Sequence, residues 1–287
     1  MTVSDVALPE APNLRWTPRP ILPGFGLTLG ITLFFLSALV LLPLIALFGK
    51  AIGMSPAHIV TFLASPRVLA AFRVSFGTAI LAAALNGPVG TLVAWVLVRY
   101  RFPGKRLLDA MVDLPFALPT AVAGVALTAL YADKGWIGAP LARLGIHVAF
   151  TPLGIFVALT FVGLPFVIRT VQPVLADLER DIEEAARTLG ATGPQIFTRI
   201  IAPPLLPAIL TGMALAFARG VGEYGSVIFI AGNLPGVSEI VPLLIVVRLQ
   251  QYDYAGAAVL GSTMLVAALA ILLLINSLQR RSANHGR

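Results

Sequence analysis

Six long apolar runs, nearly free of charged residues, dominate this sequence and restrict the folds it can adopt. One helical crossing of a bilayer core about 30 Å thick needs about 20 apolar residues, and each run is long enough for one. We therefore predict an all-α membrane protein with six transmembrane helices. A shorter stretch, 240–247, is expected to be an interfacial or re-entrant helix. The six runs are Gly24–Phe48, Val74–Val98, Val112–Tyr131, Pro152–Val171, Leu205–Ala231 and Ala255–Leu278.

Composition excludes several function classes. Hydrophobic residues make up 58% of the chain and charged residues only 11%, which rules out a water-soluble enzyme and a disordered protein. There is no cysteine, so disulfides and thiolate sites are excluded. His58, His147 and His285 lie far apart and outside the runs, so we predict neither a metal site nor a catalytic residue. No phosphate-binding G-x-x-x-x-G-K-[S/T] motif occurs, and the chain is expected to hold no cofactor of its own.

The basic residues predict the orientation in the membrane. The net charge of +7 indicates membrane orientation and not a nucleic-acid site, because Lys and Arg of membrane proteins gather in cytoplasmic loops. Residues 1–23 contain acidic residues and prolines and are expected to be a cytoplasmic tail, with 24–48 as a retained first span. With both termini in the cytoplasm, twelve basic residues lie inside and five outside. The inner set is Arg15, Arg19, Arg99, Arg101, Lys105, Arg106, Arg180, Arg187, Arg199, Arg280, Arg281 and Arg287, and the outer set is Lys50, Arg67, Lys134, Arg143 and Arg248.

The longest polar segment between spans, 172–204, is predicted to hold two short helices that meet at Gly190. Apolar residues recur at helical spacing before that glycine, and Pro194 suits the first position of the second helix. The first helix is acidic, whereas helices that adsorb to lipid are rich in Lys and Arg. We therefore expect the face with Ala185 and Ala186 to dock on another protein, while a helix lying passively on the membrane surface is the alternative.

A short motif in this loop resembles the EAA loop of ATP-binding-cassette (ABC) importer permeases. Glu184-Ala185-Ala186, three residues, Gly190, nine residues, Ile200 and then Pro203 follow the family pattern, and only Ala202 departs from its usual Leu. The resemblance implies the type I ABC importer permease fold over residues 70–280. It also implies that the helix with Glu184 is the cytoplasmic coupling helix, seated on a separate ATPase subunit.

Longer segments resemble one branch of that family, the T-type permeases of bacterial sulfate/thiosulfate transporters. These segments are 116–124, 169–173, 222–235 and 251–255. The resemblance implies ATP-driven import of sulfate or thiosulfate across the inner membrane. It also implies a W-type second permease subunit, two ATPase subunits that use ATP and Mg, and a periplasmic sulfate/thiosulfate-binding protein. A permease for molybdate, tungstate or another oxyanion is the alternative within the transport class.

Charged residues inside the runs are candidates for the translocation pathway, because they are costly in lipid. Arg219 and Glu223 are four residues apart and can pair on one helix face. Either Arg219 lines the path of a dianion while Glu223 orients it, or the two only neutralise each other. Tyr224 and Ser226 add hydrogen-bond donors beside Glu223.

Three other charged residues have less specific interpretations. Arg73 can steer anions or reach the headgroups, and Asp109 and Asp113 are expected at the interface. An intramembrane enzyme, with Glu223 and Asp113 as a carboxylate pair, is the alternative from another class, although their spacing does not bring them together.

Overall fold

The computed structural model describes residues 24–285, excluding the side chains of 278–285, and the described part is helical without strands. The predicted tail 1–23 lies outside the described residues. The chain divides into two compact units, residues 1–46 and 47–287. Helix α1 (Phe25–Leu36), in the first unit, passes through a π-helical turn, Ser37–Leu41, into α2 (Leu42–Ile52), and the boundary between the units falls within α2. The apolar helix Phe25–Ile52 is long enough to cross a membrane, as predicted for 24–48.

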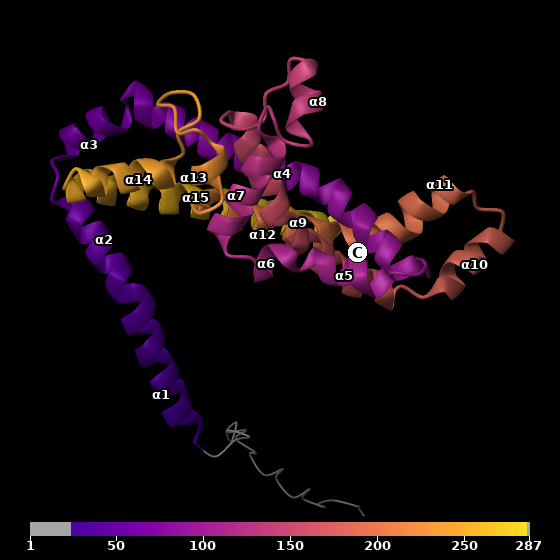
Figure 1. Cartoon of the computed structure of the whole chain (residues 1–287). Helices are drawn as coiled ribbons and strands as arrows, with labels where there is room; N and C mark the ends of the chain where they lie inside the picture. Colours follow the sequence, from indigo (N-terminus) through magenta and orange to yellow (C-terminus); the bar gives the residue numbers. More distant parts are fainter. Residues whose placement is uncertain (1–23, 286–287) are drawn as a thin grey trace, which may run out of the picture. The chain divides into compact units, whose positions relative to one another are not determined.

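Three long helices form the centre of the second unit (Figure 1). These are α4 (Pro66–Arg99), α9 (Pro152–Asp177) and α12 (Ala202–Val221). They approach closely because small residues face one another. A Cβ added to Gly90 would lie 2.8 Å from Cβ of Val167, so this contact requires glycine. Small residues at interfaces are how helices associate where no hydrophobic effect drives them together.

The directions of these helices follow from two hydrophobic clusters. One cluster joins the start of α4 and α9 to the end of α12, through Val68, Ile155 and Phe217. The other joins their opposite ends, through Leu97, Leu175 and Leu205. Helices α4 and α9 therefore run parallel, and α12 runs antiparallel to both. The chain between Arg99 and Pro152 must return from one end of the unit to the other.

That return path is broken, whereas the sequence predicted one span over 112–131. It consists of α5 (Lys105–Val112), α6 (Leu114–Ala117) and α7 (Thr120–Tyr131). Leu118 is extended before Pro119, which interrupts the helix, because a residue preceding proline is driven out of the helical region. Among the described residues, five helices are long and apolar enough to span a membrane, whereas α7 is one of two shorter apolar helices.

The predicted span 205–231 also ends early. Helix α12 stops at Val221, a non-helical turn follows, and α13 (Val227–Ile230) packs on α7. Helix α14 (Val241–Gln250), the predicted short helix, packs against α15 (Tyr254–His285). The remaining helices are α3 (Pro56–Leu63), α8 (Gly138–Arg143), α10 (Arg180–Thr188) and α11 (Gly193–Ile196), the last continuing into a π-helical turn, Phe197–Ile201. Helices α10 and α11 lie at one end of the second unit, and α3 and α14 lie at the other (Figure 1).

Candidate functional site

Helix α10 carries the EAA residues and is shorter than expected. Helix α9 continues to Asp177, so the first part of the predicted loop helix belongs to α9. Helix α10 has acidic residues in its first turn and Arg187 in its last, an arrangement that suits the helix dipole. Its end is a Schellman motif: Gly190 N–H donates to Arg187 O at 2.9 Å, and Ala191 N–H donates to Ala186 O at 3.0 Å.

Gly190 is required by its backbone conformation and not by lack of space. Its φ of +85° lies in the left-handed region, and a Cβ added there would meet no atom within 4 Å. The predicted helix stop at Gly190 is therefore confirmed, with the reason that only glycine adopts this conformation without cost. The second helix begins at Gly193, one residue before the expected Pro194, where Thr192 and Gln195 form a capping box. It is not a separate short helix, because the helical segment continues from Gly193 to Val221.

The two alanines of the motif lie on different sides of α10. Ala186 packs against the second hydrophobic cluster, whereas Ala185 is exposed. Ile182 and Leu189 share the exposed side, at 49% and 89% exposure. Only Ala185 of the two alanines therefore lies on the exposed apolar side of α10, together with Ile182 and Leu189, three or four residues away.

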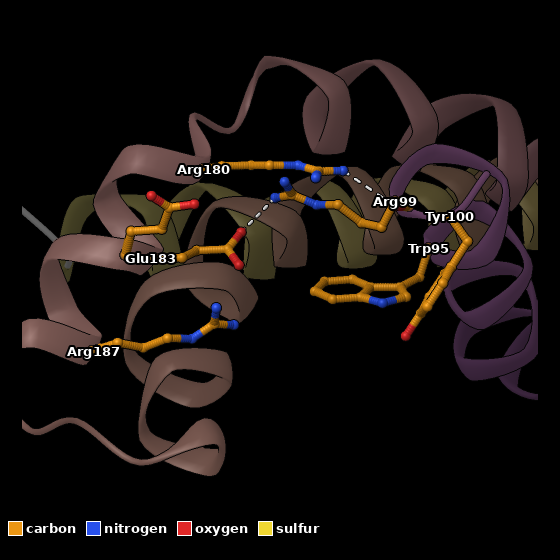
Figure 2. A pocket seen from close by; sticks show the side chains of 7 residues that line it. Trp95, Arg99, Tyr100, Arg180, Glu183 and Arg187 are labelled. Carbon is orange, nitrogen blue, oxygen red and sulfur yellow. Dashed lines mark hydrogen bonds and ion pairs between the residues drawn. The ribbon is translucent and has the colours of Figure 1, made fainter.

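Helix α10 is fastened to the end of α4 by an ion pair that the sequence analysis missed (Figure 2). Arg99 Nη2 lies 2.6 Å from Glu183 Oε1, and these side chains are only 10% and 14% exposed. Arg180 Nη2 donates to Arg99 O at 3.1 Å, and the Arg99 guanidinium lies 5.6 Å from the ring centre of Trp95. Glu183 is therefore committed within the chain, whereas Glu184 is exposed.

A pocket of about 230 Å³ lies between α10 and the end of α4 (Figure 2). Charged and aromatic side chains line it, and Arg187 extends its guanidinium toward the same space. The lining residues are Trp95, Arg99, Tyr100, Arg180, Glu183, Glu184 and Arg187.

The second group of predicted site residues surrounds Glu223, in the turn that follows α12. Arg219 and Glu223 form the expected ion pair, with Glu223 2% exposed and Arg219 38% exposed. The backbone N–H and hydroxyl of Ser226 donate to Glu223 Oε1 at 3.0 and 2.9 Å. Tyr224 is half-buried against the first hydrophobic cluster. Three of the four predicted residues thus meet at one buried carboxylate.

Helix α7 packs directly against this turn. A Cβ added to Gly124 would lie 2.8 Å from Cα of Ser226, and one added to Gly225 would lie 2.9 Å from Cβ of Thr120. Both glycines are needed for this close approach. The position of the Glu223 turn therefore depends on how α7 is held.

Arg169 is the most highly connected charged residue in the described part of the chain, and the sequence analysis assigned it no role. Its Nε and Nη2 donate to the Asp113 carboxylate at 2.9 and 2.6 Å. Its Nη1 donates to Asp109 Oδ1 at 2.8 Å and to Gln172 Oε1 at 2.6 Å, and Nη2 also donates to Asp109 O at 2.9 Å. The pKa of Asp109 is lowered because Gln172 donates a hydrogen bond to its carboxylate and Arg169 lies beside it, although burial acts in the opposite direction.

Arg169 lies inside the run 152–171, so the rule that intramembrane charges are functional would have selected it. Its two aspartates were expected at the interface, one helical turn apart. Because a guanidinium has five N–H donors, the Arg169 contacts use all of them. We call Arg169, Gln172, Asp109 and Asp113 the Arg169 clamp.

At the opposite end of the unit, Arg67 forms a two-point ion pair with the buried Glu239, with N–O distances of 2.8 and 2.7 Å. These residues lie far apart in the chain, and no sequence pattern connects them. Arg73 is exposed. His147 Nδ1 lies 2.9 Å from Asp133 Oδ1, and the described residues include no group of three metal-ligating side chains.

Comparison with known proteins gives matches over most of the chain. A family model described as the inner membrane component of binding-protein-dependent transport systems matches residues 86–284. The sulfate transport system permease protein CysT of Escherichia coli (strain K12) is 50% identical over 263 residues, which cover 92% of this chain and 95% of that protein. A probable sulfate transport system permease protein cysT of Nephroselmis olivacea is 52% identical over 249 residues, 87% of this chain and 88% of that protein.

Solved structures show the same fold at low identity. A bacterial ABC transporter involved in the import of the acidic polysaccharide alginate matches with a TM-score of 0.73 and 18% identity, covering 90% of this chain and 94% of that chain. An amino acid ABC transporter matches with a TM-score of 0.56 and 17% identity, covering 79% of this chain and 99% of that one.

Proposed function

Because the chain belongs to the family of inner membrane components of binding-protein-dependent transport systems, we propose that it is the T-type permease subunit of a sulfate/thiosulfate ABC importer. The observation that carries the substrate assignment is identity of about half over nearly the whole chain to permeases named for sulfate transport. Molybdate, tungstate or another oxyanion is the alternative substrate.

The ATPase subunit is proposed to dock on α10. The exposed apolar residues Ile182, Ala185 and Leu189 project from a helix that is otherwise charged, and such a surface is suited to a protein groove. Glu183 is paired with Arg99, so Glu184 is the one of these two neighbouring glutamates that is proposed to contact the partner. Gly190 and Ala186 hold the helix in place, one as its terminator and the other as its inner contact.

In the membrane we propose six crossings, with both termini and α10 in the cytoplasm. The third crossing would be the broken segment α6–α7, because α4 and α9 run parallel and the chain must return between them. A broken helix is tolerated at membrane depth where neighbouring helices cover it. The excess of basic residues in the proposed cytoplasmic segments supports this orientation.

The translocation pathway is proposed to pass Arg219, with Glu223, Tyr224 and Ser226 around it. The half-exposed Arg219 guanidinium can meet a dianion, while Glu223 neutralises it enough that binding stays weak and release remains fast. The complete importer would contain a W-type second permease, two ATPase subunits that use ATP and Mg, and a periplasmic binding protein for sulfate and thiosulfate.

The function is tested by uptake in a strain lacking the transporter. Restored uptake of radiolabelled sulfate, competed by thiosulfate but not by molybdate, is expected; uptake of molybdate alone would contradict the substrate assignment. Glu184→Lys is expected to lower uptake at least tenfold. Glu179→Lys, just before α10, is the matched control and should transport normally. Normal transport by the Glu184 variant would contradict the coupling role of α10.

A further inference from the structure

We propose that α5 and the loop before it bind an anionic phospholipid, with the headgroup phosphate at Arg101, Lys105 and Arg106 and the acyl chains along the outer side of α5. This site goes beyond the proposed function, because it requires only that the chain lies in a membrane and not that it transports a particular anion. It assigns a ligand to side chains that take no part in the α10 contact or in the Glu223 turn.

The first observation is the charge of an open pocket at the start of α5. The pocket has a volume of about 360 Å³, and three of its five lining residues are basic while none is acidic. Arg101 and Arg106 are exposed and form no ion pair with any described side chain, whereas the Lys105 ammonium donates to Tyr100 O at 3.3 Å. Two guanidiniums and an ammonium thus line one open space, and the oxygens of a phosphate satisfy such donors.

The second observation is that α5 is amphipathic, with its polar side turned toward the protein. Asp109 and Asp113 contact Arg169 of α9, beside which α5 lies (Figure 1). Successive residues of an α-helix are separated by about 100°, so Leu107 and Met111, each two residues from Asp109, lie on the opposite side. They are 67% and 48% exposed. The outer side of α5 is therefore apolar, which suits contact with acyl chains and not with water.

The third observation is that the basic pocket and the apolar side are continuous. Lys105 and Arg106 begin α5, and the exposed Leu107 and Leu108 follow directly. The eight residues of α5 span about 12 Å, and one leaflet of the bilayer core is about 15 Å thick, so one lipid can reach both parts.

This continuity decides between the possible occupants. A free anion or a carboxylate of a partner protein would contact the basic residues and leave the apolar side uncovered. An apolar helix of a partner subunit would cover the apolar side and leave the basic residues unpaired. A phospholipid with an anionic headgroup contacts both, so it is the occupant that the site favours.

Lipid binding by the purified full-length chain tests this site. The chain is titrated in detergent with phosphatidylglycerol or with phosphatidylcholine, and bound lipids are counted by native mass spectrometry. Phosphatidylglycerol should bind more tightly, and Arg101→Gln and Arg106→Gln should each lower its affinity about fivefold, the effect of one basic residue near anionic headgroups. Arg143→Gln, at an exposed arginine of α8 outside the pocket, is the matched control and should bind like wild type.

Leu107→Gln separates a lipid from a free anion, because only a lipid also contacts the apolar side of α5. It should lower the affinity for phosphatidylglycerol and leave the binding of inorganic phosphate unchanged. Leu144→Gln, at a residue 76% exposed that follows α8, is the control for loss of an exposed leucine. Equal effects at the two leucines would overturn the proposal.

Three further results would also overturn the proposal. The first is equal affinity of wild type for the two lipids, and the second is wild-type affinity for phosphatidylglycerol in both arginine variants. The third is a pair of arginine variants that no longer co-purify with an ATPase subunit but still bind phosphatidylglycerol normally, because the basic residues would then serve a protein contact.

Discussion

At the scale of single residues, the Arg219–Glu223 pair is asymmetric. Glu223 is buried and accepts hydrogen bonds from Ser226, whereas the Arg219 side chain is 38% exposed. Removing the exposed partner leaves a buried carboxylate without its counter-charge, but removing the buried charge leaves an arginine that water can reach. The two substitutions should therefore differ in cost.

We predict that Arg219→Gln destabilises the purified complex by about 3 kcal/mol, and Glu223→Gln by about 1 kcal/mol. Ser226→Ala, which keeps the backbone N–H bond to Glu223, should cost no more than about 1 kcal/mol. Thermal unfolding of the three variants gives the order directly. If Glu223→Gln lowered the stability most, the main cost would not come from leaving the buried carboxylate without its counter-charge.

Glycine is required at position 190 by the backbone conformation and not by side-chain packing. Gly190→Ala should fray the last turn of α10, because a left-handed conformation costs an alanine about 1 kcal/mol. Hydrogen exchange of residues 185–191 should accelerate and sulfate uptake should fall. Gly190→Asn should be milder, since asparagine tolerates this conformation.

The matched control for Gly190 is Gly193→Ala in the same loop. Gly193 has no positive φ, and a Cβ there meets nothing within 4 Å. Its substitution should leave exchange and uptake unchanged. Equal effects at the two glycines would show that general loop flexibility, and not the helix terminator, is responsible.

At the scale of elements, the Arg169 clamp fixes α5 and α6 to α9. Helix α7 follows directly, and its Thr120 and Gly124 pack on the turn that holds Glu223. Displacement of α5 would therefore be transmitted along the chain to the proposed pathway. Helix α9, which carries Arg169, also leads directly into α10, so one helix connects the proposed ATPase contact with the clamp.

We predict that Arg169→Gln releases α5 and α6, with faster hydrogen exchange over residues 105–117 and a stability loss of about 1–3 kcal/mol. Arg169→Lys should not restore protection, because an ammonium lacks the planar fork that contacts both aspartates. Arg73→Gln, at an exposed arginine on α4, is the control for loss of a positive charge. Full protection in Arg169→Lys would show that a positive charge at this position is sufficient and that the planar guanidinium is not required.

Elements were predictable from the sequence where hydrophobicity alone decides. Apolar runs located five long helices, and the Gly190 stop and the Pro194 start located the loop helices. A proline inside the run 112–131 predicts a kink at Pro119, but neither the full break there nor the end of α12 before Gly222 was predicted, because a hydropathy pattern does not register how far proline and glycine change the backbone inside an apolar run. The contacts of Arg99 with Glu183 and of Arg169 with Asp113 join distant parts of the chain, and spacing along the sequence cannot reveal them.

For the molecule as a whole, the parallel course of α4 and α9 constrains the path of the chain between them. If both cross the membrane, the segment between them must cross as well, and α8, which precedes α9, lies on the side opposite α10. The absence of cysteine makes this testable without altering a background residue, because any introduced thiol is the only one in the chain.

We predict that Thr188→Cys, on α10, reacts with a membrane-impermeant maleimide only after cells are permeabilised. Trp136→Cys, at a position 92% exposed just before α8, should react in intact cells. The unmodified chain supplies a background free of labelling. Labelling of both positions from the same side would show that α9 does not cross, and the reverse pattern would invert the orientation inferred from the basic residues. The reverse pattern, or labelling of both positions in intact cells, would also place α10, with Glu184, out of reach of a cytoplasmic ATPase.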